Sequence, residues 1–350
     1  MTSISEKEII ELLALRGGEQ ADLHKRASEI RKNHVSDRIY IRGLIEFSNI
    51  CVNDCFYCGI RKSNNRINRY ELTTQEIMSS VDEAVASGLT SLVLQSGERR
   101  DTLFISNVAE TLRLIKDKHP DIGITLSCGE QNKNVYREFF EAGASRYLLR
   151  IETSDENHYK KLHPESMNFN NRVRCLRDLR STGYQVGTGV MINSPYQTPE
   201  ILAGDILFFR ELDIDMCGMG PFIPHRDTSM GGWDYNIDES LNLGLNMIAV
   251  LRLVMPDINI ASTTALETLS HQGREMGIQA GANVVMPQFS PAKNRNQYML
   301  YDNKPVSEKP GSELVDLISR KIKILGLIPA AEESGTSIHY LRRNDNDSSC

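Results

Sequence analysis

Three cysteines lie within eight residues of one another, in the segment Cys51-Val-Asn-Asp-Cys55-Phe-Tyr-Cys58-Gly59. Three thiolates at this C-x3-C-x2-C spacing can bind one cubic iron–sulfur cluster, and they leave its fourth iron without a protein ligand. An iron with an open position can chelate a substrate or cofactor directly, as an open zinc site does. The segment therefore predicts a catalytic metal centre rather than one that only transfers electrons.

A zinc site and chance clustering are the alternatives to an iron–sulfur cluster. Three nearby thiols could form part of a zinc site, but no second C-x2-C pair exists to complete it, and the next histidine along the chain, His119, is 61 positions after Cys58. Chance clustering of buried cysteines is rare at this density. The remaining internal cysteines, Cys128, Cys175 and Cys217, stand in apolar or helical contexts and are expected to be packing thiols.

The elements that must position this motif alternate between short apolar runs and longer helical patterns. We expect eight strands, each followed by a helical segment: 39–47, 91–95, 122–127, 146–151, 185–192, 215–220, 258–262 and 283–286. This alternation predicts an α/β fold, a parallel (β/α)8 TIM barrel with an N-terminal helical extension. A doubly wound open sheet is the competing prediction, but no glycine-rich phosphate loop follows the first strand. The cysteines then lie at the C-terminal mouth of the barrel, where active sites of this fold are built.

We expect three regions: a helical extension over residues 1–38, the barrel over 39–310, and a C-terminal helix with a polar tail over 311–350. The formal net charge of −6 does not favour binding to nucleic acid. No apolar run reaches membrane-spanning length, and the N-terminus lacks the pattern of a signal peptide. The sequence thus predicts a cytoplasmic protein without nucleic-acid or membrane partners, monomeric by default.

The spacing of the cysteines, and the aromatic Tyr57 directly before the last of them, resemble the radical S-adenosylmethionine (SAM) superfamily. That resemblance implies one 4Fe-4S cluster bound by Cys51, Cys55 and Cys58, with SAM chelated at the open iron. It also implies reductive cleavage of SAM to methionine and a 5′-deoxyadenosyl radical. The implied electron donor is a flavodoxin- or ferredoxin-type protein.

Longer stretches resemble the branch that contains biotin synthase, methylornithine synthase and the HydE-type maturases of FeFe-hydrogenase. They are 45–51, 93–98, 146–153, 220–225, 263–264 and 281–287. This resemblance implies cofactor-binding roles for individual residues. Gln95, Ser96, Gly97 and Glu98 would receive the methionyl amino group, and Arg172 would pair with the methionyl carboxylate. Glu152 would bind the ribose hydroxyls, and Tyr57 would lie beside the adenine.

The HydE-type resemblance further implies that Arg150, Thr125, Thr263 and Thr264 hold the carboxylate of a small, cysteine-derived substrate. Arg150 alternates with the apolar Leu149 and Ile151, so it can point into the barrel together with Glu152. A buried arginine is costly unless it meets a charge. The alternative is a purely structural Arg150–Glu152 pair on the barrel floor.

The sequence also departs from the HydE pattern. The second cysteine cluster of some HydE proteins is excluded, because 294–328 contains no cysteine. Relatives usually carry Gly-Leu-Pro-Gly-Gln-Thr after the fifth strand, where this chain has Asn193 and Tyr196. The first hypothesis is therefore a HydE-type maturase working with other maturation proteins. The second is a HydE-like paralogue that catalyses amino-acid isomerisation or assembles another metal cofactor, and the third is a barrel that binds SAM or a metal without radical chemistry.

Overall fold

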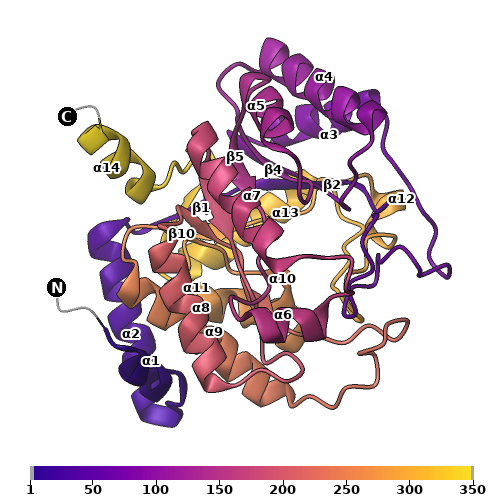
Figure 1. The fold of residues 1–350 in the computed structure, drawn as a ribbon. Coiled ribbons are helices and arrows are strands. Elements are labelled where there is room, and N and C mark those ends of the chain that lie inside the picture. Colours follow the sequence, from indigo (N-terminus) through magenta and orange to yellow (C-terminus); the bar gives the residue numbers. More distant parts are fainter. Residues whose placement is uncertain (1–3, 348–350) are drawn as a thin grey trace.

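The centre of the molecule is a curved parallel sheet with helices around it (Figure 1). The structure is a computed structural model that describes residues 4–347, with the backbone alone for 346–347. Its seven-stranded sheet has the order β10 (Asn259–Ile260), β8 (Met216–Cys217), β6 (Gln185–Thr188), β5 (Ala144–Leu148), β4 (Gly123–Ser127), β3 (Ser91–Ser96) and β2 (Gly43–Ser48). Each of the first seven apolar runs expected from the sequence therefore contributes a strand.

A second sheet closes the first into a barrel. It has the order β11 (Val284–Val285), β1 (Arg38–Ile41) and β12 (Ile328–Ala330), and Arg42 alone separates β1 from β2. On the other side, a parallel bridge between Ala261 and Val284 joins the end of β10 to β11. Leu44 of β2 accepts from the Phe289 amide at 2.7 Å. The ring of eight strands is thus complete, and the predicted (β/α)8 barrel is confirmed.

Helices follow the strands and cover the outside of the barrel, and their first residues carry helix-capping patterns. Thr73 and Glu76 form a capping box at the start of α3, for example. The helices that follow the first five strand positions are α3 (Thr74–Ala86), α4 (Thr102–Lys118), α5 (Lys133–Glu141), α6 (Glu156–Leu162), α7 (Phe169–Thr182) and α8 (Pro199–Glu211). Later in the chain come α9 (Ile237–Val254), α10 (Thr264–Leu269), α11 (Gly273–Gln279), α12 (Ala292–Arg295) and α13 (Gly311–Ile324).

Two helices precede the barrel, α1 (Glu6–Leu13) and α2 (Gly17–His34), and they pack against α8 and α9. Two short strands, β7 (Met191–Ile192) and β9 (Gly220–Pro221), pair beyond the ends of β6 and β8. The domain boundaries at residues 38 and 310 stay a prediction. No helix within residues 4–347 has the length and apolar character needed to cross a membrane.

The C-terminal region holds more structure than the single helix and polar tail expected there. After α13 the chain adds β12 and then α14 (Ile338–Asp347), while Cys350 lies outside the described residues. Between β12 and α14 the carbonyl oxygen of Gly335 accepts from Arg42 Nη2 at 2.9 Å and from Asn259 Nδ2 at 2.8 Å. Arg146 Nη2 donates to the neighbouring carbonyl of Ser334 at 2.8 Å. The segment 334–337 therefore covers the N-terminal end of the barrel.

Replacing Gly335 by alanine should destabilise the fold through this contact. Gly335 has φ +62°, and an added Cβ would lie 2.6 Å from Tyr40 Cγ. Backbone strain and overpacking together should lower the free energy of unfolding by about 2–4 kcal/mol in urea denaturation. Gly326→Ala is the matched control, since φ is +74° there but no atom lies within 4 Å. Gly326→Ala should lower the free energy of unfolding by only about 1 kcal/mol. Equal losses of stability in the two variants would contradict the role of the close contact between Gly335 and Tyr40.

Candidate active site

The cysteine loop begins directly after β2 and is tied to the segment that follows β3. The Gly97 amide donates to the Ser48 carbonyl at 2.9 Å, and the Val52 amide donates to the Glu98 carbonyl at 2.9 Å. Gly97 has no room for a side chain, because an added Cβ would overlap the Ile50 carbonyl and lie 2.9 Å from Cys51 Cβ. The predicted methionyl-binding segment thus packs against the first cysteine.

Arg69 holds the far end of the loop in place. Its guanidinium donates to the backbone carbonyls of Asn49, Ile60 and Arg61, at 2.7, 2.8 and 2.5 Å. Burial raises the pKa of the Cys51 and Cys58 thiols, and the positive charge of Arg69 partly opposes this rise. Sequence reasoning missed this residue, because arginine donors to backbone carbonyls leave no pattern in a sequence.

The three thiols of the loop affect one another's protonation. Burial first, and then the charge of Cys51, raises the pKa of Cys58 to about 12. Burial followed by the charges of Cys58 and Cys51 raises the pKa of Cys55 well above its usual value. Within residues 4–347 no three His, Cys, Asp or Glu side chains converge on a single ion. A cubic cluster has a different requirement, since each of its three thiolates binds its own iron.

Arg172 of α7 connects the ends of three strands. Its Nε donates to Glu130 Oε1 at 2.6 Å, and its Nη1 donates to the Arg150 carbonyl at 2.5 Å. Its Nη2 lies 3.9 Å from Glu98 Oε2, and the arginine side chain is 8% exposed. Burial alone would lower the pKa of Arg172, but interactions that include Glu130 and Glu98 hold this pKa well above its usual value. The structure therefore brings the predicted Arg172 and Glu98 together.

Glu130 is a site residue that sequence reasoning missed. Glu130 follows β4 in the same way as Glu98 follows β3, and each glutamate comes directly after a glycine. The amide of Glu130 donates to Glu98 Oε2 at 2.9 Å. Gly129, at φ +74°, is the glycine that lets these two glutamates approach, because an added Cβ would overlap the Glu98 side chain. The repeated Gly-Glu pair after two successive strands was the available signal.

Glu152 has a backbone conformation that non-glycine residues avoid. Its φ is +66°, and its amide and carbonyl are fixed by Gly189 and Met191 at 3.0 and 3.1 Å. Its Oε2 lies 2.9 Å from Arg150 Nη2, yet it is buried and has no aligned hydrogen-bond donor among the described residues. Burial raises the pKa of Glu152, while Arg150 and Arg172 oppose that shift. This carboxylate can therefore still accept hydrogen bonds from a ligand.

Tyr57 lies in an apolar cluster with a histidine that fixes its hydroxyl. His163 Nδ1 donates to the Tyr159 carbonyl at 2.9 Å, so Nε2 is left to accept from Tyr57 Oη at 3.2 Å. Burial and the charge of Arg172 lower the pKa of His163 to about 3, which keeps the imidazole neutral. The apolar neighbours of Tyr57 are Phe56, Leu162, Met191, Phe222 and Met230. A flat, uncharged surface of this kind suits an aromatic base.

Comparison with known proteins agrees with this geometry. Residues 45–208 match the family model of the radical SAM superfamily. The [FeFe] hydrogenase maturase subunit HydE of Thermotoga maritima is 40% identical over 321 residues, which cover 91% of this chain and 90% of that protein. The chain belongs to the HydE group of the radical SAM superfamily. It is a radical SAM enzyme, and the cofactors of its family are a 4Fe-4S cluster and SAM.

More distant relatives share the same architecture. A 3-methylornithine synthase of Methanosarcina barkeri is 27% identical and spans 94% of this chain and 91% of that enzyme. The crystal structure of methylornithine synthase superposes with a TM-score of 0.79 at 24% identity, covering 94% of each chain. The X-ray structure of the maturase HydG from Carboxydothermus hydrogenoformans gives 0.81 at 19% identity, covering 97% of this chain and 78% of HydG. These two structures show that the radical SAM barrel is shared.

The residues present fit the two cofactors of the family. Cys51, Cys55 and Cys58 are partly exposed free thiols on one loop. The backbone of Gln95–Glu98 packs against this loop, Arg172 stands beside Glu98, and the incompletely hydrogen-bonded Glu152 lies one strand further on. This HydE-group chain thus carries a thiolate set and a polar cradle side by side at the mouth of the barrel.

The predicted substrate residues come from two parts of the ring that lie several strands apart. Thr125 and Arg150 come from β4 and the end of β5, and Thr125 Oγ1 and Arg150 Nε are buried without a hydrogen-bond partner among residues 4–347. Thr263 and Thr264 follow β10, several strands around the ring. Thr263 Oγ1 donates to the Met219 carbonyl at 3.3 Å. The Arg150–Glu152 pair lies beyond the C-terminal end of β5, at the mouth and not on the floor.

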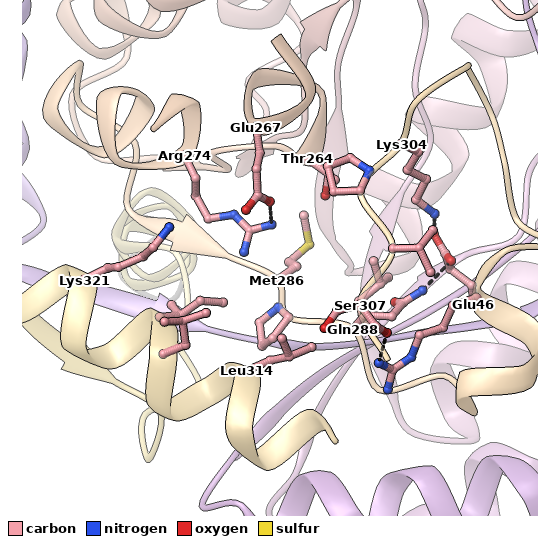
Figure 2. A pocket seen from close by; sticks show the side chains of 17 residues that line it. Glu46, Thr264, Glu267, Arg274, Met286, Gln288, Lys304, Ser307, Leu314 and Lys321 are labelled. Carbon is pink, nitrogen blue, oxygen red and sulfur yellow. Dashed lines mark hydrogen bonds and ion pairs between the residues drawn. The ribbon is translucent and has the colours of Figure 1, made fainter. Parts of the chain in front are cut away.

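Thr264 lines a side pocket of about 150 Å³ that is shown in Figure 2. There Glu46 Oε1 accepts from Lys304 Nζ, and Glu46 Oε2 accepts from Gln288 Nε2, both at 2.5 Å. Arg274 and Glu267 form a second ion pair at 2.6 Å. Sequence reasoning did not identify these charged residues of the side pocket.

The segment around Tyr298–Lys304 folds over the mouth of the barrel, and sequence reasoning missed this as well. The Leu300 carbonyl accepts from the Gly59 amide at 2.8 Å, and Tyr298 Oη accepts from Gln95 Nε2 at 3.2 Å. Burial raises the pKa of Tyr301, and a hydrogen bond with Thr268 and the charge of Arg150 partly oppose this rise.

Gly97→Ala should prevent the cluster from being incorporated. The added methyl group must displace the Ile50 carbonyl and Cys51, so the three thiolates lose their geometry. Iron content and visible absorbance after anaerobic reconstitution should fall about tenfold or more, with the far-ultraviolet dichroism unchanged. Gly18→Ala is the control, because no atom lies within 4 Å of its added Cβ. Normal iron content in the Gly97 variant would refute this close packing.

Glu130→Gln should weaken SAM binding without removing the cluster. The substitution keeps the shape of the side chain but leaves Arg172 without its charged partner at 2.6 Å. Because a truncated or neutralised partner of a buried ion pair is costly, we expect the dissociation constant for SAM to rise about tenfold or more. Equilibrium binding to the reconstituted protein measures it. Glu138→Gln, on the partly exposed Arg113–Glu138 pair at 3.9 Å, should change nothing, and equal effects of both variants would contradict the assignment.

Proposed function

We propose that this chain is a HydE-type maturase of FeFe-hydrogenase, acting on a small carboxylate-bearing, cysteine-derived precursor. The observation that carries the proposal is the 40% identity to HydE across nine-tenths of both chains. The site supports it, because Thr125 and Arg150 leave buried polar atoms unsatisfied inside the barrel. Such atoms are costly unless a ligand pairs with them.

The residues divide the work of binding as follows. When bound, the cluster and SAM supply a 5′-deoxyadenosyl radical through one-electron cleavage of the sulfonium. Cys51, Cys55 and Cys58 hold the cluster, and Gln95–Glu98 and Arg172 orient the methionyl group. Glu152 accepts from the ribose hydroxyls, and Tyr57 covers the adenine.

On the substrate side, Arg150, Thr125, Thr263 and Thr264 bind the carboxylate. The loop over the mouth, residues 297–304, excludes water, so that a reactive intermediate is not quenched. The same proposal includes a flavodoxin- or ferredoxin-type electron donor and other maturation proteins as partners. It places the enzyme in the cytoplasm.

A second function is favoured by one observation on the chain itself. Asn193 and Tyr196 both have positive φ values, 57° and 66°, in a loop where HydE relatives carry glycines. Tyr196 is 52% exposed and stacks edge-on against Trp233 at 5.0 Å. This change in the loop after the fifth strand supports a paralogue that acts on another amino-acid-derived molecule. The name of the relative 3-methylornithine synthase indicates a product of that kind.

The first experiment is anaerobic reconstitution followed by addition of dithionite and SAM. 5′-Deoxyadenosine should form, as measured by chromatography, and Cys55→Ala should abolish it while Cys128→Ala retains it. Cys128 is buried in the apolar core and is not part of the cysteine loop. The second experiment adds the protein to a lysate that contains hydrogenase apoprotein and the other maturases but no HydE. Restored hydrogenase activity supports the maturase, whereas deoxyadenosine without restoration favours the paralogue.

A further inference from the structure

An open hollow of about 740 Å³ lies on the surface beside the cysteine loop. The residues that line it are Val52, Asn53, Arg100, Glu130, Ser166, Met167, Asn168, Asn170, Asn171 and Arg174. It does not belong to the barrel interior, since its walls are the loop itself, the end of β3 and the start of α7. Of its lining residues, Glu130 also belongs to the cofactor site described above, where it binds Arg172.

The hollow comes close to the cysteines. Val52 and Asn53 lie between Cys51 and Cys55 in the chain, and both face the hollow. Met167, on its opposite wall, places Sδ 3.6 Å from Cys55 Sγ. A molecule seated in the hollow would therefore be separated from a cluster ligand by a single layer of side chains.

The rim of the hollow is basic in a protein whose net charge is −6. The Arg100 side chain is 52% exposed, but its charge is paired with Glu98 and, at 3.1 Å, with Glu130. Arg174 is exposed and donates to the neutral side chain of Asn171. Glu130 is the one acidic residue among the described residues of the lining, and it is 6% exposed and bound by Arg172. Asparagines complete the rim with neutral amides.

The adjoining part of the loop extends the same charge. From Cys51 to Arg69 the chain has four basic residues and a single acidic one, Asp54, which is paired with Arg61 at 2.7 Å. Lys62 is exposed, and its amide is bound to the Asn53 carbonyl at 2.8 Å, directly beside the hollow. Val52, one of the two apolar residues of the lining, is 46% exposed.

We propose that this hollow docks an acidic one-electron carrier protein, of the flavodoxin or ferredoxin class, whose surface carboxylates meet Arg174 and Lys62. The proposal rests on the radical SAM chemistry above, in which each reductive cleavage consumes one electron from outside the chain. In the step itself the carrier loses one electron and the cluster gains it, and no bond is made or broken. Opposite charges on the two surfaces accelerate such an encounter and make it sensitive to salt.

The test measures binding of an acidic flavodoxin to the reconstituted protein, by the polarisation of its flavin fluorescence at low and at physiological salt. Arg174→Glu should raise the dissociation constant at low salt about tenfold or more and flatten its salt dependence. Asn170→Asp, an isosteric change in an exposed lining residue, should weaken binding about threefold or more. The matched control is Arg177→Glu, since Arg177 is exposed on the same helix but does not line the hollow.

A parallel measurement separates docking from the chemistry. With dithionite as reductant, deoxyadenosine formation by Arg174→Glu should equal that of the wild type, while reduction by the flavodoxin is slowed. The docking proposal is overturned if the wild type does not bind the carrier at low salt. If Arg177→Glu weakens binding as much as Arg174→Glu, the carrier docks outside the hollow. Absence of deoxyadenosine from the wild type with dithionite would instead refute the proposed function, whatever the binding data show.

Discussion

One buried guanidinium connects the parts of this site. Arg172 reaches from α7 to Glu130 after β4, to the carbonyl of Arg150 after β5, and to within 3.9 Å of Glu98 after β3. Burying such a charge is favourable only when it is fully paired. The ends of three neighbouring strands are therefore held at fixed distances from one another. Because Glu98 is also bound to the cysteine loop through its carbonyl, the same interaction positions the thiols.

The sequence predicted what depends on local pattern. The strands of a parallel barrel are covered on the outside and packed on the inside, so they are short apolar runs such as Ser91–Gln95, which matches β3 to within one residue. The cysteine motif could be placed at the mouth because it directly follows the first such run. The Arg150–Glu152 pair could be anticipated from alternation along one strand, although its depth in the barrel could not.

What the sequence did not reveal consists of contacts between distant segments. Lys304 meets Glu46 from 258 positions away, and Leu300 bonds to Gly59 only because the chain after β11 folds back across the mouth. Neither segment has a periodic pattern, since both are irregular loops held by individual hydrogen bonds. The helix α14 was expected to be a tail because its sequence is polar. Its stability comes instead from ion pairs such as Arg343–Asp215 at 2.8 Å, which tie it to the base of the barrel.

The charges inside the barrel bear on what it can hold. Arg42 and Arg146 are buried near the floor and donate to carbonyls and hydroxyls, and the charge of Arg146 lowers the pKa of Arg42 in addition to burial. Arg150 adds a third guanidinium closer to the mouth. Positive charge in a low-dielectric space attracts anions, which is consistent with a carboxylate-bearing substrate and does not by itself select one.

Selection among such substrates must therefore come from the rim. The cofactor residues lie on the side of the ring formed by β2 to β5, whereas Asn193, Tyr196 and Trp233 lie beyond β7 and β9. The left-handed backbone at Asn193 and Tyr196 is strained for non-glycine residues, and strain of this kind persists only where surrounding contacts impose it. A change confined to that side can alter which molecule enters while leaving the cluster and SAM sites unaffected. The rim beyond β7 and β9 can thus differ between relatives while the side formed by β2 to β5, which also carries Thr125 and Arg150, stays the same.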